Sequence, residues 1–293
     1  MSGEQLRPDR KQIVAMASLF RHAKNGVFVS MRSFEEGTSE VFSRQGVPIN
    51  GTGLGPVIET AVRIAERAAN ARAPVVFCPP IAGFANPRDA TEACLEEGYA
   101  LSVECDVRPH AARRKLEQLL GPATLVVASG GAWTDPETGA VEDKLHLHWR
   151  LTEPAAGEDL KRLKELRILA ARIAGADPTG ASVVHPIRWA GTWHRKGEPR
   201  LARIVAQDDG HELELGEALA ILRGVAPPET RRAARGEPMR GPLEGGEGDG
   251  RDDAELMRGI VSGEKFHPNL VPLAARFIGR GFRPPPPSRS SAR

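Results

Sequence analysis

The feature that most constrains this chain is an alternation of helix-like and strand-like segments over its first 224 residues. In some segments apolar residues recur every three or four positions, as in amphipathic helices, and in others they form short β-rich runs typical of strands. The helical spacing predicts helices over residues 10–22, 54–73, 111–120 and 158–174. The β-rich runs predict strands over residues 26–31, 75–78, 98–107, 124–128, 144–151 and 201–205.

Prolines and glycines predict where several of these segments end. Pro74 is expected to stop the second helix, and Gly121 is expected to stop the third. Ser129-Gly130-Gly131 is expected to break the strand before it. Residues 133–143 contain Asp-Pro-Glu-Thr-Gly, which predicts a turn or hairpin insertion.

The composition changes after residue 224, which predicts the domain organisation. Residues 225–251 hold many Pro, Gly, Glu and Arg and few large apolar residues, which is typical of a flexible linker. Residues 252–282 regain helical periodicity in two short pieces, and residues 283–293 form a Pro-, Arg- and Ser-rich tail expected to be disordered. We therefore expect one catalytic domain over residues 1–224, a linker, a small helical element and a tail.

Charge and cysteine content exclude several classes of protein. Lys and Arg total 40 against 38 Asp and Glu, so any binding of nucleic acid must come from a local basic patch. The three cysteines have no zinc-knuckle spacing and are odd in number, which indicates reduced thiols. No apolar run approaches the roughly 20 residues that span a bilayer. We therefore predict a soluble, cytoplasmic protein with no membrane partner.

Two acidic residues stand one residue apart on a predicted strand. Because side chains two apart share one strand face, Glu104 and Asp106 are expected to point the same way. Neighbouring carboxylates repel unless a cation lies between them, and hard oxygen ligands suit Mg²⁺ or Mn²⁺. The alternative is an exposed strand face that carries two solvated acids.

Two histidines share a face of the strand that follows the Ser129-Gly130-Gly131 turn. His146 and His148 could donate hydrogen bonds to a phosphate, and the glycines allow a close approach of the backbone to a ligand. The alternative is that each histidine is an ordinary hydrogen-bonded residue of the core or surface and that the glycines form a plain turn.

A third polar cluster follows the longest predicted helix. Asp177 comes first, and residues 188–196 then combine Arg188, Lys196 and His194 with two tryptophans. Arginine and lysine are natural partners of triphosphate oxygens, and the tryptophans could stack on bases or pack in the core.

The order of these three clusters resembles the three motifs of the archaeo-eukaryotic primase superfamily, over about residues 75–205. The closest branch is that of the primase-polymerases of plasmids, phages and other mobile elements. The motif positions are matched by Glu104 and Asp106, then by Ser129 and His146, and then by Asp177 with Arg188, Gly191, Thr192 and Lys196. Glu104 replaces the usual first Asp, His148 falls where an aromatic is frequent, and Ala190 and His194 replace Pro and Asn.

The resemblance implies an α/β (α+β) fold, with a two-layer core related to the RNA-recognition fold, an accessory N-terminal α/β part and a small C-terminal helical element. It implies that Glu104, Asp106 and Asp177 are catalytic and hold two divalent ions, Mg²⁺ or Mn²⁺. Ser129, His146, Arg188 and Lys196 would bind the nucleotide, with His148 and His194 in secondary roles. The implied activity is primer synthesis on single-stranded DNA from NTPs or dNTPs, with a replicative helicase as a further partner.

Two other functions are left open by the sequence. A His-hydrophobic-His strand also occurs in HUH-type nucleases and relaxases, which cut DNA with a tyrosine, and Tyr99 is the single tyrosine of this chain. A replication-initiation or single-strand-binding module could keep the fold without catalysis, and the Glu104 replacement allows that alternative.

Overall fold

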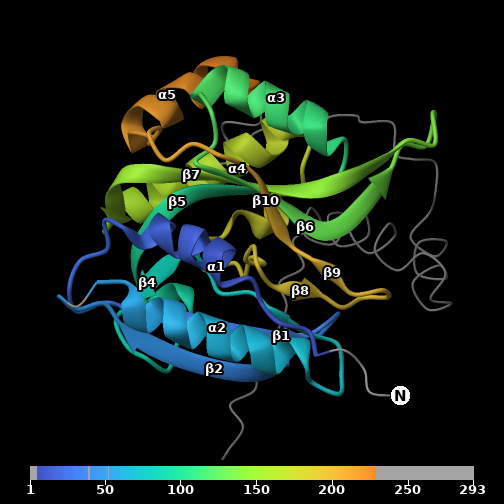
Figure 1. Cartoon of the computed structure of the whole chain (residues 1–293). Helices are drawn as coiled ribbons and strands as arrows, with labels where there is room; N and C mark the ends of the chain where they lie inside the picture. Colours follow the sequence, from blue (N-terminus) through green and yellow to red (C-terminus); the bar gives the residue numbers. More distant parts are fainter. Residues whose placement is uncertain (1–4, 39, 52, 229–293) are drawn as a thin grey trace, which may run out of the picture. The chain divides into compact units, whose positions relative to one another are not determined.

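The computed structural model describes residues 5–38, 40–51 and 53–228, and a sheet of eight strands organises them (Figure 1). The strand order is β10-β6-β7-β5-β4-β1-β2, with β3 paired to β1, and these pairings are antiparallel. The strands are β1 (Phe28–Glu35), β2 (Val41–Pro48), β3 (Val75–Phe77), β4 (Ala82–Phe84), β5 (Leu95–Cys105), β6 (Leu125–Thr134), β7 (Val141–Ala156) and β10 (Arg203–Gln207). A separate small pair consists of β8 (Trp193–His194) and β9 (Arg200–Leu201).

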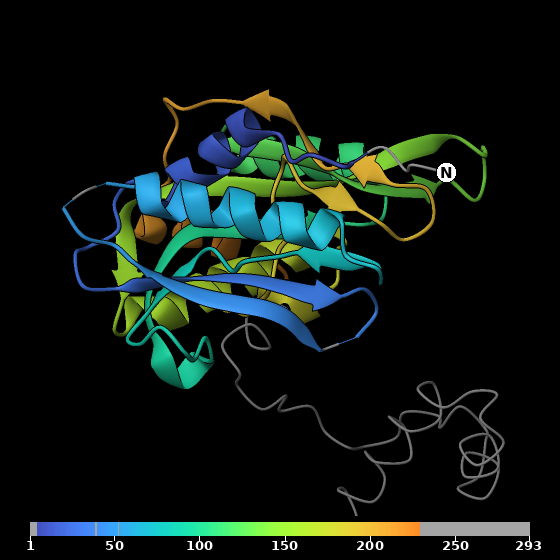
Figure 2. The ribbon, with the colours of Figure 1, turned by 60° about the horizontal axis from the view of Figure 1, so that its bottom comes forward.

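Helices pack on both faces of this sheet. They are α1 (Arg10–Ala17), α2 (Gly55–Ala69), α3 (Pro109–Leu120), α4 (Asp159–Ala174) and α5 (Leu215–Val225), with short 3-10 turns η1 (Ser18–Phe20), η2 (Glu92–Cys94) and η3 (Pro178–Ala181). In Figure 1, α3, α4 and α5 lie on one side of β5 and β7, and α1 and α2 lie on the other. Figure 2 shows α2 running along β1 and β2. The predicted mixed α/β class is confirmed.

The alternation of side chains along β7 separates the core from the polar face. Leu145, Leu147 and Trp149 belong to the core under α3, α4 and α5. Successive side chains of a strand point to opposite faces, so His146 and His148 point toward the side of α1. The predicted sharing of a face by the two histidines is confirmed.

Most predicted elements are present, and several boundaries differ from the prediction. Gly121 ends α3 with a φ of 78°, a backbone region that glycine adopts without strain. By contrast, α2 ends at Ala69 with Asn70 as its C-cap, so the predicted end at Pro74 is wrong. The sequence did not predict β2, β4 or α5. The N-terminal helix is confirmed over α1 and η1, and Asp9 caps it by accepting from the N–H of Lys11.

The Ser129-Gly130-Gly131 segment does not break its strand. β6 continues to Thr134, and its register to β7 shifts between Ala128 and Ala132, as at a β-bulge. Gly130 has a φ of 86°, which lets the bulge form without ending the ladder. The predicted break is therefore wrong, whereas the predicted hairpin is confirmed between Thr134 and Val141.

The predicted linker, the small helical element over residues 252–282 and the tail over residues 283–293 lie outside the described residues, apart from residues 225–228. Within the described ranges, no helix is long and apolar enough to cross a membrane.

Candidate functional site

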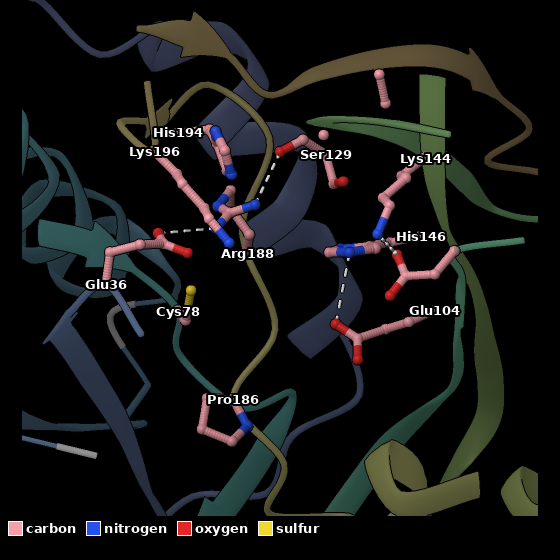
Figure 3. A pocket seen from close by; sticks show the side chains of 13 residues that line it. Glu36, Cys78, Glu104, Ser129, Lys144, His146, Pro186, Arg188, His194 and Lys196 are labelled. Atoms are coloured by element: carbon pink, nitrogen blue, oxygen red, sulfur yellow. Dashed lines mark hydrogen bonds and ion pairs between the residues drawn. The ribbon is translucent and has the colours of Figure 1, made fainter. Parts of the chain in front are cut away.

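A polar cavity of about 470 Å³ lies where the ends of β5, β6 and β7 meet the segment between η3 and β8 (Figure 3). Its lining carries three carboxylates, three basic side chains and two imidazoles. These residues are Glu36, Glu104, Asp106, Lys144, Arg188, Lys196, His146 and His194. The structure therefore gathers residues from all three sequence clusters around one space, and charges of both signs face each other across it.

Glu104 is held between two imidazoles. Its Oε1 lies 3.4 Å from Nε2 of His146 on β7, and its Oε2 lies 3.2 Å from Nε2 of His185. Burial raises the pKa of Glu104, but the hydrogen bond from His185 and the nearby charges outweigh burial and lower that pKa to about 2. Glu104 is therefore ionised at neutral pH.

His146 is buried beside this carboxylate, and burial lowers its pKa from the ordinary value. A neutral imidazole has one N–H to donate. In the tautomer that carries its proton on Nε2, His146 can direct that proton at Glu104 or at a phosphate oxygen that enters the cavity.

Asp106 follows the last residue of β5 and is paired with Lys144. The Lys144 Nζ lies 3.3 Å from Oδ1 of Asp106. The Asp106 side chain is 59% exposed, so it is open to a ligand from the cavity side. Because Glu104 and Asp106 both line the cavity, their two carboxylates are accessible from one space.

Arg188 crosses the opposite side of the cavity and is anchored at two points. Its Nη1 donates to the Ser129 carbonyl at 3.0 Å, and its Nη2 lies 3.4 Å from Oε2 of Glu36. The next residue, Trp189, is fully buried and fixes this segment in the core. Ser129 thus contributes its backbone carbonyl, rather than its hydroxyl, to the contacts seen here.

Two further predicted residues lie at the same rim. Lys196 lines the cavity, and His194 of β8 lies near Arg188 (Figure 3). Burial and then the positive charge of Arg188 lower the pKa of His194, which favours the neutral ring.

Two predicted site residues do not line the cavity. His148 is fully buried, and its Nδ1 lies 2.9 Å from the Ser102 hydroxyl on the neighbouring strand. Asp177 is an exposed cap of η3 whose carboxylate accepts from the N–H of Thr179 at 2.9 Å. Asp177 therefore does not line the cavity, although the charge of Glu104 lies close enough to oppose the lowering of the Asp177 pKa by its hydrogen bonds to Thr179.

The tryptophans and Tyr99 bear on the alternatives left open by the sequence. Trp189 packs against Phe20 and Phe77 in the core, whereas Trp193 is half-buried and donates from its indole to the Arg7 carbonyl. Tyr99 is buried, and its hydroxyl donates to Glu97 at 2.9 Å. A nucleophilic tyrosine must reach a DNA phosphate, so this burial argues against the nuclease alternative.

Three residues around the cavity were missed from the sequence. Lys144 lies two positions before His146, so the period-two alternation of the strand could have found it. His185 and Glu36 follow η3 and β1, and no local pattern marks either of them. Their roles depend on contacts between segments that are far apart in the chain.

The donor set fits a divalent ion that is carried with a phosphate ligand. Mg²⁺ is usually held by one or two carboxylates together with substrate phosphates, and Glu104 and Asp106 provide two such groups. In the part of the chain that the structure describes, no three acidic, histidine or cysteine side chains are arranged to hold a metal by themselves.

The fold is similar to that of a primase-polymerase domain from a cyanophage. No protein-family model matches the chain, and no curated protein matches it. The AEP domain of the primase-polymerase of cyanophage S-2L is similar over 74% of this chain and 100% of that domain, with 18% identity and a TM-score of 0.51.

Two structures of the primase RepB' are less similar, both with a TM-score of 0.46. The catalytic domain in complex with initiator DNA has 15% identity and covers 78% of this chain and 98% of its own. RepB' itself has 16% identity over 93% of this chain and 83% of its own. The likeness to the cyanophage domain shows a shared fold.

Proposed function

We propose that this chain belongs to the archaeo-eukaryotic primase superfamily and synthesises primers on single-stranded DNA in the replication of a plasmid, phage or other mobile element. The reaction is template-directed nucleotidyl transfer from NTPs or dNTPs. One observation carries the proposal: Glu104 and Asp106 face Arg188 and Lys196 across a single cavity of a primase-like fold. Acids on one side and cations on the other suit a triphosphate that brings its own divalent ion.

The cationic side of the cavity would bind the triphosphate. Arg188 is held by the Ser129 carbonyl and by Glu36, so its guanidinium is positioned before the nucleotide arrives. Lys196 adds a second positive charge at the rim. The neutral His146 can donate a hydrogen bond to a phosphate oxygen without adding charge. Charge neutralisation and positioning are the main sources of rate in this chemistry.

The acidic side would hold the metal. Glu104 and Asp106 would hold Mg²⁺ or Mn²⁺, which when bound would supply the positive charge that activates an attacking hydroxyl and offsets the pyrophosphate. The hydrogen bond from His185 and the charge of Arg188 help to keep Glu104 ionised at neutral pH, so it is ready to bind a cation.

The test is primer synthesis from labelled nucleotides on single-stranded DNA with Mg²⁺ or Mn²⁺. Asp106→Ala should abolish metal-dependent products while keeping the circular-dichroism spectrum. Asp143→Ala is the matched control, because Asp143 is a carboxylate on the neighbouring strand β7, is paired with Arg203 and does not line the cavity. Full synthesis by Asp106→Ala would reject the assignment of the site.

A second candidate function is favoured by the contact of Lys144 with Asp106 and by the position of Asp177 outside the cavity. A non-catalytic module would bind nucleotide or single-stranded DNA through Arg188 and Lys196 without transferring the nucleotide. Metal-dependent nucleotide binding with no product on any template would favour this candidate.

A further inference from the structure

The two faces of the paired strands β1 and β2 have different surroundings. Figure 2 shows α2 lying along one face, where Met31 of β1 and Val47 of β2 belong to the core. Successive side chains of a strand point to opposite faces, so Arg32, Phe34 and Arg44 point to the other face. Arg44 is exposed there, and the other two are partly buried.

The two arginines of this second face are direct neighbours. The antiparallel register places Arg32 opposite Arg44. Residues in that position have their Cβ atoms about 4.5–5.5 Å apart, and like charges so placed repel each other. Burial and then the charge of Arg44 lower the pKa of Arg32, whereas the weaker effect of Asp89 raises it. An anion bound between the two guanidiniums would relieve this repulsion.

An exposed aromatic ring lies beside the arginine pair. The register shifts between Ser33 and Phe34, where Phe42 is the additional residue of β2, as at a β-bulge. Phe42 is 45% exposed, and it is the one aromatic ring among the exposed large apolar side chains of the described residues. Aromatic rings next to cationic groups are the elements on which unpaired bases stack. We name this surface the β1–β2 platform, and it consists of Arg32, Arg44, Phe34 and Phe42.

The β1–β2 platform leads along β1 toward the cavity. Phe34 lies two positions before Glu36, which lines the cavity (Figure 3). The path from Arg32 to Glu36 is about 13 Å long, at about 3.3 Å per residue of an extended chain. At its other end the platform is closed, because Pro87 packs on Gly46 so tightly that an added Cβ would collide with it.

We propose that the β1–β2 platform binds the single-stranded DNA template and leads it to the cavity. This inference rests on the proposed function. The arginine pair would bind backbone phosphates, and the two rings would stack on unpaired bases. A second copy of this chain fits the platform poorly, because a symmetric contact would bring the same positive charges together.

The test measures binding of the full chain to a fluorescent oligothymidine and to a DNA duplex, by anisotropy over a range of salt concentrations. Phe42→Ala should raise the single-strand Kd at least about fivefold, the lower end for one stacked base, and should leave the duplex Kd unchanged. Phe42→Tyr should keep the wild-type Kd. Arg44→Gln should reduce the slope of log Kd against log salt by about 0.7, the value for one phosphate contact. The control is Arg63→Gln, because Arg63 is an exposed arginine of α2, on the covered face of the same strands, where it donates to Gln45.

Each other outcome identifies what is wrong. A wild-type Kd in Phe42→Ala and a wild-type salt slope in Arg44→Gln would overturn the platform and leave the proposed function standing, since the template would then bind elsewhere. Equal weakening of single-strand and duplex binding by Phe42→Ala would overturn the stacking role. A shift from dimer to monomer in sedimentation of Phe42→Ala, with unchanged DNA binding, would assign the surface to a second copy instead. If the wild type binds no single-stranded DNA, the proposed function fails, and this inference fails with it.

Discussion

Arg188→Met should weaken nucleotide binding and also destabilise the fold, by amounts that follow from two contacts. The Arg188 side chain is 13% exposed, and its guanidinium donates to the Ser129 carbonyl at 3.0 Å and lies 3.4 Å from Glu36. A buried acceptor that loses its donor costs about 1–3 kcal/mol, so the free energy of unfolding should fall by that amount. A charge-assisted hydrogen bond to a phosphate contributes about 1.5–3 kcal/mol, so the nucleotide Kd should rise roughly 10- to 150-fold.

The assay combines urea unfolding with titration of a fluorescent dNTP. Arg188→Lys should give a stability and a nucleotide Kd between those of the wild type and Arg188→Met, because a lysine keeps the charge but cannot bridge Ser129 and Glu36 in the same way. Arg203→Met is the control, since Arg203 is exposed, pairs with Asp143 and does not line the cavity. An unchanged nucleotide Kd in a folded Arg188→Met protein would refute the assignment of Arg188 to the phosphates.

Three further predictions concern the structure around the site. Gly191 and Gly197 both have positive φ, but a Cβ on Gly191 would lie 2.4 Å from the Asp9 carbonyl oxygen, whereas a Cβ on Gly197 would meet no atom within 4 Å. In thermal unfolding, Gly197→Ala should therefore lower the stability by about 1 kcal/mol and Gly191→Ala by about 3 kcal/mol. Burial lowers the pKa of His148 from 6.5 to about 3, so between these values the unfolded chain binds a proton that the folded chain does not. The free energy of unfolding should therefore fall by about 1.4 kcal/mol per pH unit as the pH drops from 6.5 toward 3. Urea unfolding of His148→Gln should show a shallower dependence of stability on pH, and an unchanged dependence would contradict the buried neutral ring. Tyr99→Phe should keep full primer synthesis, and a loss of synthesis in this variant would indicate a role for the tyrosine hydroxyl.

The parts of the site that lie on single strands could be predicted from the sequence. Strand periodicity alone places Glu104 on the face of Ser102 and places His146 on the face of His148. The hairpin turn that is visible in the sequence as Asp-Pro-Glu-Thr-Gly joins β7 to β6. The register that places Glu104 opposite His146 joins β5 to β7, which are not consecutive in the chain. The core of the fold followed from the same periodicity, because alternate apolar residues of β7 pack under the helices.

The remainder of the site depends on contacts between distant segments. His185 reaches Glu104 across 81 positions of the chain, and Glu36 reaches Arg188 across 152. No local pattern specifies such contacts. Asp177 is a metal ligand only by the resemblance, and this stays a prediction; in the structure its carboxylate caps η3. A capping Asp before Pro-Thr is a local interaction that competes for the same side chain.

Incorporation of labelled nucleotides on homopolymeric single-stranded templates tests the central claim most directly. With Mg²⁺ or Mn²⁺ present, the wild type should incorporate only the nucleotide complementary to each template, and Glu104→Gln should lose that incorporation while remaining folded. Incorporation that ignores the template, or that persists unchanged in Glu104→Gln, would contradict template-directed transfer at this cavity.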